Sequence, residues 1–155
     1  MDAFESFVRH AEPKLRHALV ATYGATRGRE AVAEALAWAW EHWDRVAGLE
    51  HPIGYLYRVG QSRTKRFETY SGHSDVADTF PDPAAVGLPW VEPGLVRALA
   101  GLSEHQRVAV VLVHALEWRL SEVAELLGIA KTSVQNHLER GLARLRSQLE
   151  VASNG

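Results

Sequence analysis

The stretch from Leu120 to Leu149 constrains the fold most, because its pattern predicts two helices joined by a tight turn. Gly128 fits the left-handed backbone conformation that ends a helix, and Ser121 is the expected N-cap of the helix before it. After the turn, apolar residues recur at helical steps along one face, which predicts a long second helix. Together these features predict a helix-turn-helix. The apolar stripe of the second helix consists of Val134, Leu138, Leu142, Leu145 and Leu149.

The opposite face of the second helix is polar, and it predicts contact with DNA. Amides and hydroxyls near the start of a helix can read base edges, and Arg or Lys can bind phosphate or guanine. A merely solvated face is the alternative, but the helix-turn-helix spacing favours DNA contact. Ala130 offers no capping side chain, so Thr132 and Gln135 are expected to form a capping box that starts the helix later. The candidate DNA-binding residues are Lys131, Thr132, Ser133, Gln135, Asn136, Arg140 and Arg144.

The composition excludes several other classes of protein. The chain contains no cysteine, so a disulfide framework and a thiolate metal site are excluded. It also lacks HExxH, phosphate-loop and nucleophile motifs, and we expect no enzyme activity, cofactor or metal. No apolar run approaches the ~18 residues of a membrane span, and the N-terminus is unlike a signal peptide, so a cytoplasmic location is expected. The net charge of −2 argues against a free-standing, tight DNA binder.

Helical periodicity also dominates the N-terminal part, where no alternating strand pattern occurs. It predicts helices at about 2–22, 29–46 and 53–70, and Pro13 is expected to break or bend the first turns of the first helix. Tyr23-Gly24 is expected to end that helix. The fold class predicted from these patterns is all-α.

The second of these helices carries an apolar stripe of Val32, Leu36, Trp40 and Trp43. Trp40 and Trp43 are therefore expected in the core. Trp38 falls off the stripe, which leaves it available to a protein partner.

The third helix combines aromatic residues with a basic cluster. Tyr55 and Tyr57 are two residues apart and cannot share a helix face, so one of them is expected in the core. Aromatic faces can stack unpaired bases while neighbouring cations bind the strand, although core packing is the alternative for each aromatic. The basic cluster consists of Arg58, Arg63, Lys65 and Arg66.

Residues 71–94 change in composition, because prolines and glycines rule out a long regular element. Such a stretch is too long for an ordinary connection within a compact domain. We therefore predict two small helical domains, 1–70 and 95–152, joined by a flexible linker at 71–94. The linker is acidic, with Asp75, Asp78 and Asp82 and no Lys or Arg from Glu68 to Glu92.

Three shorter helices are expected in the second domain, at about Leu95–Leu102, Ser103–Leu116 and Ser121–Leu127. Ser103 and Gln106 have the spacing of a capping box at the start of the middle helix.

The C-terminal half resembles region four of a bacterial sigma-70-type factor over GLSEHQRVAVVLVHALEWRLSEVAELLGIAKTSVQNHLERGLARLRSQL. The N-terminal half is similar to region two, in EAVAEALAWAWEHWDRV and PIGYLYRVGQSRTKRF. Having only these two regions resembles the extracytoplasmic-function group. The resemblance implies a sigma factor that directs core RNA polymerase to promoters, reads the minus-thirty-five element with region four and the minus-ten element with region two, and is held in some cases by an anti-sigma protein.

The same resemblance implies roles for residues of region two. The helix that grips the polymerase clamp would present Glu34, Trp38 and Glu41. In the family the acidic linker threads polymerase channels. Two departures concern promoter opening: alanines thin the acidic start of the clamp-binding helix, and Gln61-Ser62 stands where an Arg-Asn pair is common. The minus-ten helix would contact DNA through Tyr55, Arg58, Arg63, Lys65 and Arg66.

Two other functions fit parts of the pattern. KTSVQNHL is also close to the recognition helix of a response-regulator type transcription factor, but that class predicts an N-terminal receiver with alternating strands and helices. A sigma-like adaptor that no longer initiates transcription is the other alternative, favoured by the departures in region two.

Overall fold

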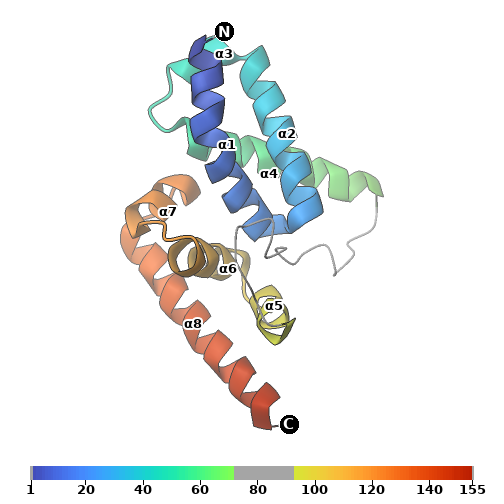
Figure 1. Ribbon diagram of the computed structural model, residues 1–155, viewed down its shortest axis with the longest axis vertical. Helices are drawn as coiled ribbons and strands as arrows, with labels where there is room; N and C mark the ends of the chain where they lie inside the picture. The colour runs from blue at the N-terminus through green and yellow to red at the C-terminus, as the bar shows by residue number, and fades with distance from the viewer. Residues whose placement is uncertain (1, 72–92, 155) are drawn as a thin grey trace.

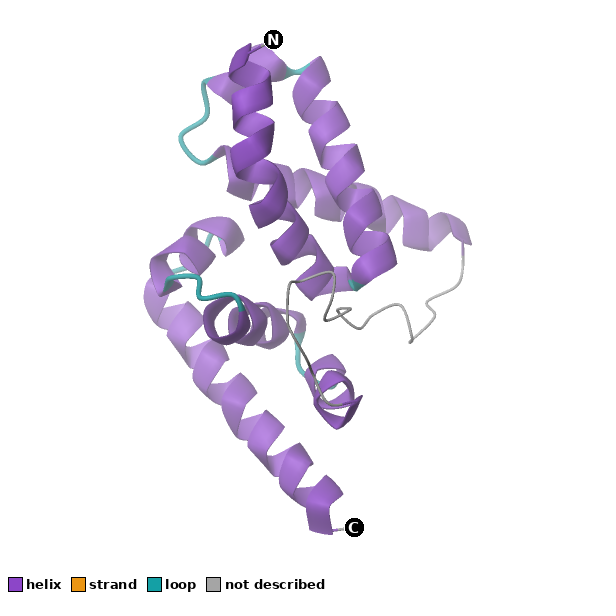
Figure 2. Cartoon of the chain, in the orientation of Figure 1, coloured by secondary structure: helices purple, strands orange, loops and turns teal. Residues whose placement is uncertain are grey.

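The computed structural model describes residues 2–71 and 93–154, and these residues form helices joined by short turns (Figure 1). No strand occurs within them, so the predicted all-α class is confirmed (Figure 2). Residues 72–92, which make up most of the predicted linker and include its three aspartates, lie outside the described residues. None of the described helices has both the length and the apolar character that crossing a membrane requires. The helices of the first half are α1 (Asp2–Tyr23), α2 (Ala25–Glu41), α3 (Trp43–Ala47) and α4 (Pro52–Ser71).

Helix α1 is the centre of the first half, where it packs against both α2 and α4. Pro13 lies inside this continuous helix, so the predicted break does not occur. The buried residues Ala11 and Leu15 lie on either side of the proline, and their packing keeps this segment helical. The helix ends at Gly24 as predicted, where φ is 91°.

Helix α2 begins and ends earlier than predicted: it starts at Ala25, and the chain leaves the helix at His42 and resumes as α3. Its buried face is made of small residues, including Ala31, Ala35 and Ala39. This alanine face packs closely on α1 and α4, which turns Trp40 outward to 51% exposure. The prediction that Trp40 lies in the core is therefore wrong, whereas Trp43 on α3 packs against the core.

The second half consists of α5 (Pro93–Ala100), α6 (Glu104–Val110), a π-helical turn (Val111–Ala115), α7 (Leu120–Leu127) and α8 (Lys131–Asn154). The predicted capping box is present at α6, where Ser103 Oγ accepts from the Gln106 N–H at 3.3 Å and the Ser103 N–H donates to Gln106 Oε1 at 3.2 Å. Such reciprocal bonds satisfy N–H groups that a helix start leaves unpaired.

The helix-turn-helix is formed by α7 and α8. Gly128 has φ 67° and ψ 34°, as the left-handed prediction requires. Its N–H donates to the Ala124 carbonyl at 2.8 Å and ends α7. The N-cap prediction is wrong, because α7 begins at Leu120 and Ser121 lies inside its first turn. The Glu122 carboxylate accepts instead from the Arg119 backbone N–H at 3.2 Å.

Helix α8 starts at Lys131, earlier than the predicted Thr132 capping box would allow. The Ala130 carbonyl already accepts from the backbone N–H groups of Ser133 and Val134, so the turn needs no capping side chain. The apolar stripe is buried at Val134, Leu138 and Leu145 and half-buried at Leu142. Leu149 departs from the prediction with 37% exposure, since the C-terminal turns of α8 project beyond the other helices (Figure 1).

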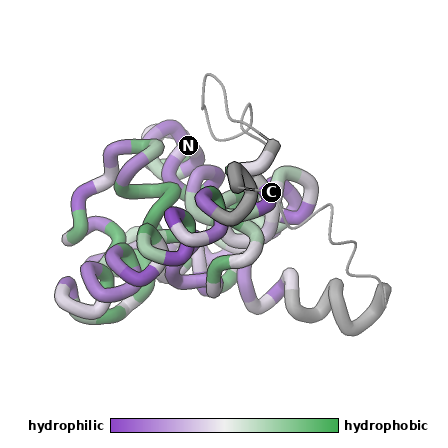
Figure 3. Tube along the Cα trace, turned by 90° about the horizontal axis from the view of Figure 1, so that it is seen from below, coloured by the Kyte–Doolittle hydropathy of each residue, from purple (hydrophilic) through white to green (hydrophobic). Residues whose placement is uncertain are grey.

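The two halves lie against each other, with α6 packed on α1 and α7 packed on α4. Most of the buried apolar side chains of both halves belong to one contiguous cluster. Hydropathy alternates along the described helices, as expected for helices that bury one face (Figure 3).

The packing of α8 predicts that Leu138→Ala lowers the free energy of unfolding by ~2–5 kcal/mol, because the substitution leaves a cavity between α8 and its neighbours. Leu149→Ala is the matched control on the same helix, and its exposed side chain predicts a change of roughly 0.5 kcal/mol or less. Urea denaturation followed by circular dichroism measures both. Equal losses in the two variants would contradict the packing described for α8.

Candidate nucleic-acid interface

The candidate reading surface is the polar face of α8, which begins directly after the Gly128 turn. Its exposed side chains lie opposite the buried stripe, as predicted, and Ser133 is half-buried. The exposed members of the predicted set are Lys131, Thr132, Gln135, Asn136, Arg140 and Arg144.

Two of these residues make side-chain hydrogen bonds. Gln135 Nε2 donates to Glu139 Oε1 at 3.4 Å, one turn along α8. Arg144 Nη1 donates to Gln106 Oε1 on α6 at 3.4 Å. Both bonds are long and exposed, so duplex DNA could replace them at modest cost. The surface offers amides, hydroxyls and cations, which are the groups that read base edges and bind phosphate.

His137 belongs to the same helix and was not predicted as a functional residue. Its ring lies edge-on to His105 of α6, with 5.1 Å between ring centroids. Partial burial, together with the charges of His105 and Arg140, lowers the pKa of His137 below its ordinary value. A neutral imidazole beside Arg140 adds no repulsion to that cation. Nothing in the sequence indicates this pairing, because it depends on how α6 crosses α8.

The aromatic residues of α4 divide as the spacing predicts. Tyr57 is buried, and its hydroxyl lies 2.7 Å from Thr22 Oγ1. Burial raises the pKa of Tyr57. Tyr55 is half-buried beside Trp38, with 5.5 Å between ring centroids, and the Arg45 guanidinium lies 5.6 Å from the Tyr55 ring. The exposed edge of Tyr55 therefore belongs to an aromatic and cationic cluster.

The two described basic side chains of α4, Arg58 and Arg63, make separate contacts. Arg58 is exposed, and its Nη1 lies 3.4 Å from the position that a Cβ of Gly128 would occupy. Arg63 Nη1 lies 3.4 Å from Glu34 Oε2 on α2, so a predicted DNA-binding residue contacts a predicted polymerase-binding residue. The side chains of Lys65 and Arg66 lie outside the described residues.

The remaining polymerase-binding candidates lie towards the C-terminal end of α2. The Trp38 ring is half-buried and stacks on His42, with 4.3 Å between centroids. Glu41 is exposed and lines a hollow with Trp40. Trp40 is a large exposed aromatic residue at this end of α2, with 5.0 Å between its ring centroid and that of Phe4. Trp40 is absent from the predicted polymerase-binding residues because its place on the apolar stripe predicted a core position.

Comparison with known proteins bears on this arrangement. The family model of sigma-70, region 4 matches residues 94–145. The chain is 30% identical over 121 residues to the RNA polymerase sigma-E factor of Streptomyces antibioticus, which covers 76% of this chain and 67% of that protein. It is 28% identical over 152 residues to the ECF RNA polymerase sigma factor SigL of Mycobacterium tuberculosis, covering 91% of this chain and 85% of SigL.

Two solved structures share the fold. The sigma factor RpoE of Bartonella quintana, in complex with the anti-sigma factor NepR, superposes with a TM-score of 0.69 at 21% identity and covers 97% of this chain and 99% of that chain. CnrH, in complex with the cytosolic domain of CnrY, gives a TM-score of 0.62 at 21% identity over 97% of this chain and 89% of that chain.

Fold and surface define a two-part helical protein that ends in a helix-turn-helix of the DNA-reading type. The chain belongs to the sigma-70 family of RNA polymerase sigma factors, in the extracytoplasmic-function group.

Proposed function

We propose that this sigma factor directs core RNA polymerase to promoters by reading the minus-thirty-five element with α8 and the minus-ten element with α4. The observation that carries the proposal is the exposed polar face of α8, which the Gly128 turn places on the outer side of a helix-turn-helix. In this motif the second helix enters the major groove and its first turns contact base edges. Gln135, Asn136 and Arg140 supply the groups for such contacts.

The proposed role of α4 depends on groups that bind a separated strand. Tyr55 offers an aromatic face beside Arg45, and Arg58 and Arg63 offer cations along the same helix. Base stacking with neighbouring positive charge is the usual means of binding single-stranded DNA. We assign Lys65 and Arg66 to the same strand path from their positions in the sequence.

The net charge supports a requirement for polymerase. A chain with net charge −2 gains little from the phosphate backbone, so each reader on its own is weak. Two weak readers attached to one large enzyme gain affinity through effective concentration. The proposed contacts to polymerase are Glu34, Trp38 and Glu41, together with the exposed Trp40 beside them.

The proposed setting follows from this role. The protein would act in the cytoplasm, without catalytic chemistry of its own. An anti-sigma protein is a further proposed partner, supported by the solved complexes of RpoE with NepR and of CnrH with CnrY. The response-regulator alternative requires a receiver with strands, whereas residues 2–71 are helical.

The assignment of α8 is tested by alanine substitution. Arg140→Ala is expected to weaken promoter binding by the polymerase complex by about 1–3 kcal/mol if the side chain reads a base, and less if it binds phosphate. Gln135→Ala tests a second reader on the same face. Arg146→Ala removes an exposed cation farther along α8 and serves as the control. Band-shift titration and run-off transcription measure the effect. Unchanged promoter-specific transcription in both reader variants would exclude this face.

We also propose that residues 1–70 and 95–152 are separate folding units joined by residues 71–94. Support comes from the proline and glycine content of that stretch and from its length. Limited proteolysis is expected to cut first between Ser71 and Gly94, leaving two helical fragments. Preferred cutting inside Ala31–Arg45 or Val123–Leu145 would contradict the division.

A further inference from the structure

His137 lies on the side of α8 that faces α6, next to the polar reading face. Its ring is half-buried and edge-on to the ring of His105 on α6, with 5.1 Å between the ring centroids. Arg144 lies on the same side of α8, about two turns further along, and its Nη1 donates to Gln106 Oε1 of α6 at 3.4 Å. We refer to this strip, formed by His137 and Arg144 beside His105 and Gln106, as the α6 flank.

The proposed base contacts do not use the α6 flank. Residues three, four or seven positions apart lie on one side of a helix, so Arg140 stands close to both His137 and Arg144. Arg140 is exposed and belongs to the reading face, which continues from it to Asn136. The flank is therefore a cationic edge of the reading face, on the side where α6 crosses α8.

The dimensions of DNA decide what such a flank would meet. An α-helix with its side chains is about 10–12 Å across, and the major groove of B-DNA is roughly 12 Å wide. A recognition helix therefore fills the groove. The face directed at the base pairs reads their edges, while the flanks of the helix lie along the phosphates that border the groove. An imidazolium and a guanidinium are both strong donors to phosphate.

Without DNA, His137 is held towards its neutral form. Partial burial lowers the pKa of His137, and the charges of His105 and Arg140 lower it further. A histidine ordinarily titrates close to neutral pH, so these neighbours keep the ring uncharged over most of the physiological range. The flank of the free chain thus carries the charge of Arg144 beside a histidine that can still accept a proton.

The carboxylates nearest to the pair in sequence are directed elsewhere. Glu104 precedes His105 on α6, but its Oε1 accepts from Gln61 Nε2 of α4 at 2.9 Å. Glu139 of α8 accepts from Gln135 at 3.4 Å, one turn back along the same helix. Neither bond draws a negative charge onto the α6 flank.

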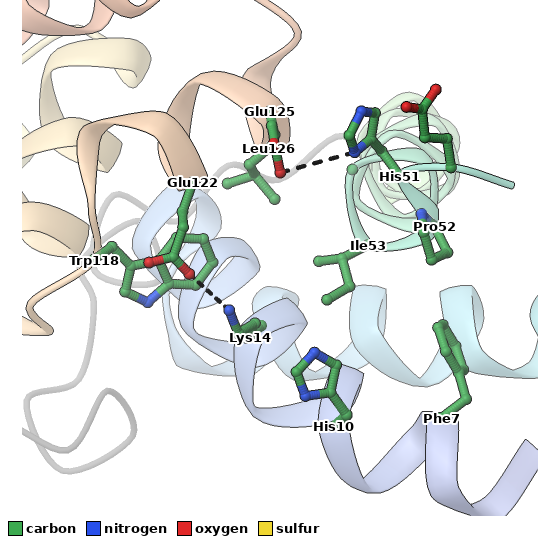
Figure 4. Close-up of a pocket in the computed structure, with 12 residues that line it drawn as sticks. Phe7, His10, Lys14, His51, Pro52, Ile53, Trp118, Glu122, Glu125 and Leu126 are labelled. Atoms are coloured by element: carbon green, nitrogen blue, oxygen red, sulfur yellow. Dashed lines mark hydrogen bonds and ion pairs between the residues drawn. The ribbon is translucent and has the colours of Figure 1, made fainter.

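The other helices packed on α8 leave the same balance of charge. On α7, Glu122 accepts from Lys14 at 2.7 Å, and Glu125 Oε2 lies 3.8 Å from His51 Nδ1, so both carboxylates face the first half (Figure 4). The charged residue of α5 is Arg97, an exposed cation. A docking polyanion is therefore the source of negative charge that the α6 flank fits.

We propose that the α6 flank binds the phosphate backbone of DNA and that His137 takes up a proton as the backbone docks, so that promoter affinity rises as the pH falls. This inference deepens the proposed function and rests on it where promoters are concerned. An opposite charge within ~4–6 Å favours the charged form of a histidine. A docked phosphate supplies that charge, whereas the charges that act on His137 in the free chain oppose protonation.

The sign of the pH dependence follows from linkage between proton binding and DNA binding. The pKa of His137 is lowered in the free chain, and a neighbouring phosphate raises it in the complex. The complex therefore binds more protons than the free chain, and acidification favours the complex. One proton changes the association constant by at most about tenfold per pH unit. The dependence is expected between roughly pH 7.5 and pH 6, where histidine titrates.

Nuclear magnetic resonance measures the protonation step directly. The full chain, with assigned imidazole signals, is titrated with acid at low salt and in the presence of a metal chelator, with and without a DNA duplex. The duplex should raise the pKa of His137, whether or not it contains a promoter, because phosphate contacts do not depend on sequence. The signal of His114, an exposed histidine of the π-helical turn, should not respond to the duplex. This measurement uses the unsubstituted chain, so it does not depend on how a variant folds.

Substitution tests the consequence for affinity. His137→Gln keeps a polar side chain that cannot take up a proton. Holoenzyme, formed with core RNA polymerase, is titrated with promoter DNA at pH 7.5 and at pH 6. The unsubstituted chain should gain roughly three- to tenfold in affinity on acidification. His137→Gln should lose most of that gain and bind with little change at pH 7.5. His114→Gln is the matched control and should keep the gain.

Arg144 tests the phosphate assignment of the flank. Arg144→Gln should weaken binding to promoter and non-promoter duplexes about equally, and it should reduce the slope of log affinity against log salt by about 1. An unchanged salt slope in Arg144→Gln would overturn the assignment of this flank to the backbone.

The inference and the proposed function can fail separately. If a duplex raises the pKa of His137 but polymerase neither binds the chain nor takes it to a promoter, the phosphate contact is supported and the proposed sigma function fails. If the holoenzyme is promoter-specific but the pKa of His137 does not rise on DNA, the inference is overturned and the proposed function stands. Retention of the full acid gain by His137→Gln would overturn the inference as well.

Discussion

The left-handed turn at Gly128 is the constraint on which the proposed DNA reader depends. It ends α7 through the bond to Ala124 and lets α8 begin at Lys131, so that one face of α8 packs on α6 and α7 while the other meets solvent. A side chain at this φ would be strained, and a different turn would rotate the polar face of α8. The position of Gln135, Asn136 and Arg140 therefore follows from backbone geometry.

Much of the structure of the C-terminal half, α5 to α8, could be predicted because the sequence patterns that determine it are local. The stripe of Val134, Leu138 and Leu145 and the capping box at Ser103 depend on residues within a few turns of one another. The starts of α7 and α8 were predicted less well: at α7 the Glu122 carboxylate accepts from the Arg119 N–H, and at α8 the Ala130 carbonyl accepts from the first backbone N–H groups. The first half was harder: α2 packs through alanines, whose small side chains give a weak periodic signal beside the tryptophans, and Trp40 was placed in the core although it is exposed.

The predicted site residues divide in the same way. Those on α8 share one exposed face, because a single helix positions them. Those on α4 and α2 depend on tertiary contacts: Arg63 pairs with Glu34, Trp38 stacks on His42, and Arg58 lies at the helix-turn-helix. Periodicity within one helix carries no information about which residues of another helix it will meet. Arg107 is a further example. Its position in the sequence is typical of a charged residue on an exposed helix surface, but tertiary packing buries it between the halves.

The central claim is that two individually weak readers become a promoter-specific factor only on core RNA polymerase. Permanganate footprinting of a promoter from the same genome, with the chain alone and with core polymerase added, tests this most directly. We predict no reactive thymines with the chain alone at physiological salt, and reactive thymines near the minus-ten element with polymerase. Tight, sequence-specific binding by the chain alone, with no polymerase association in a pull-down, would contradict the account.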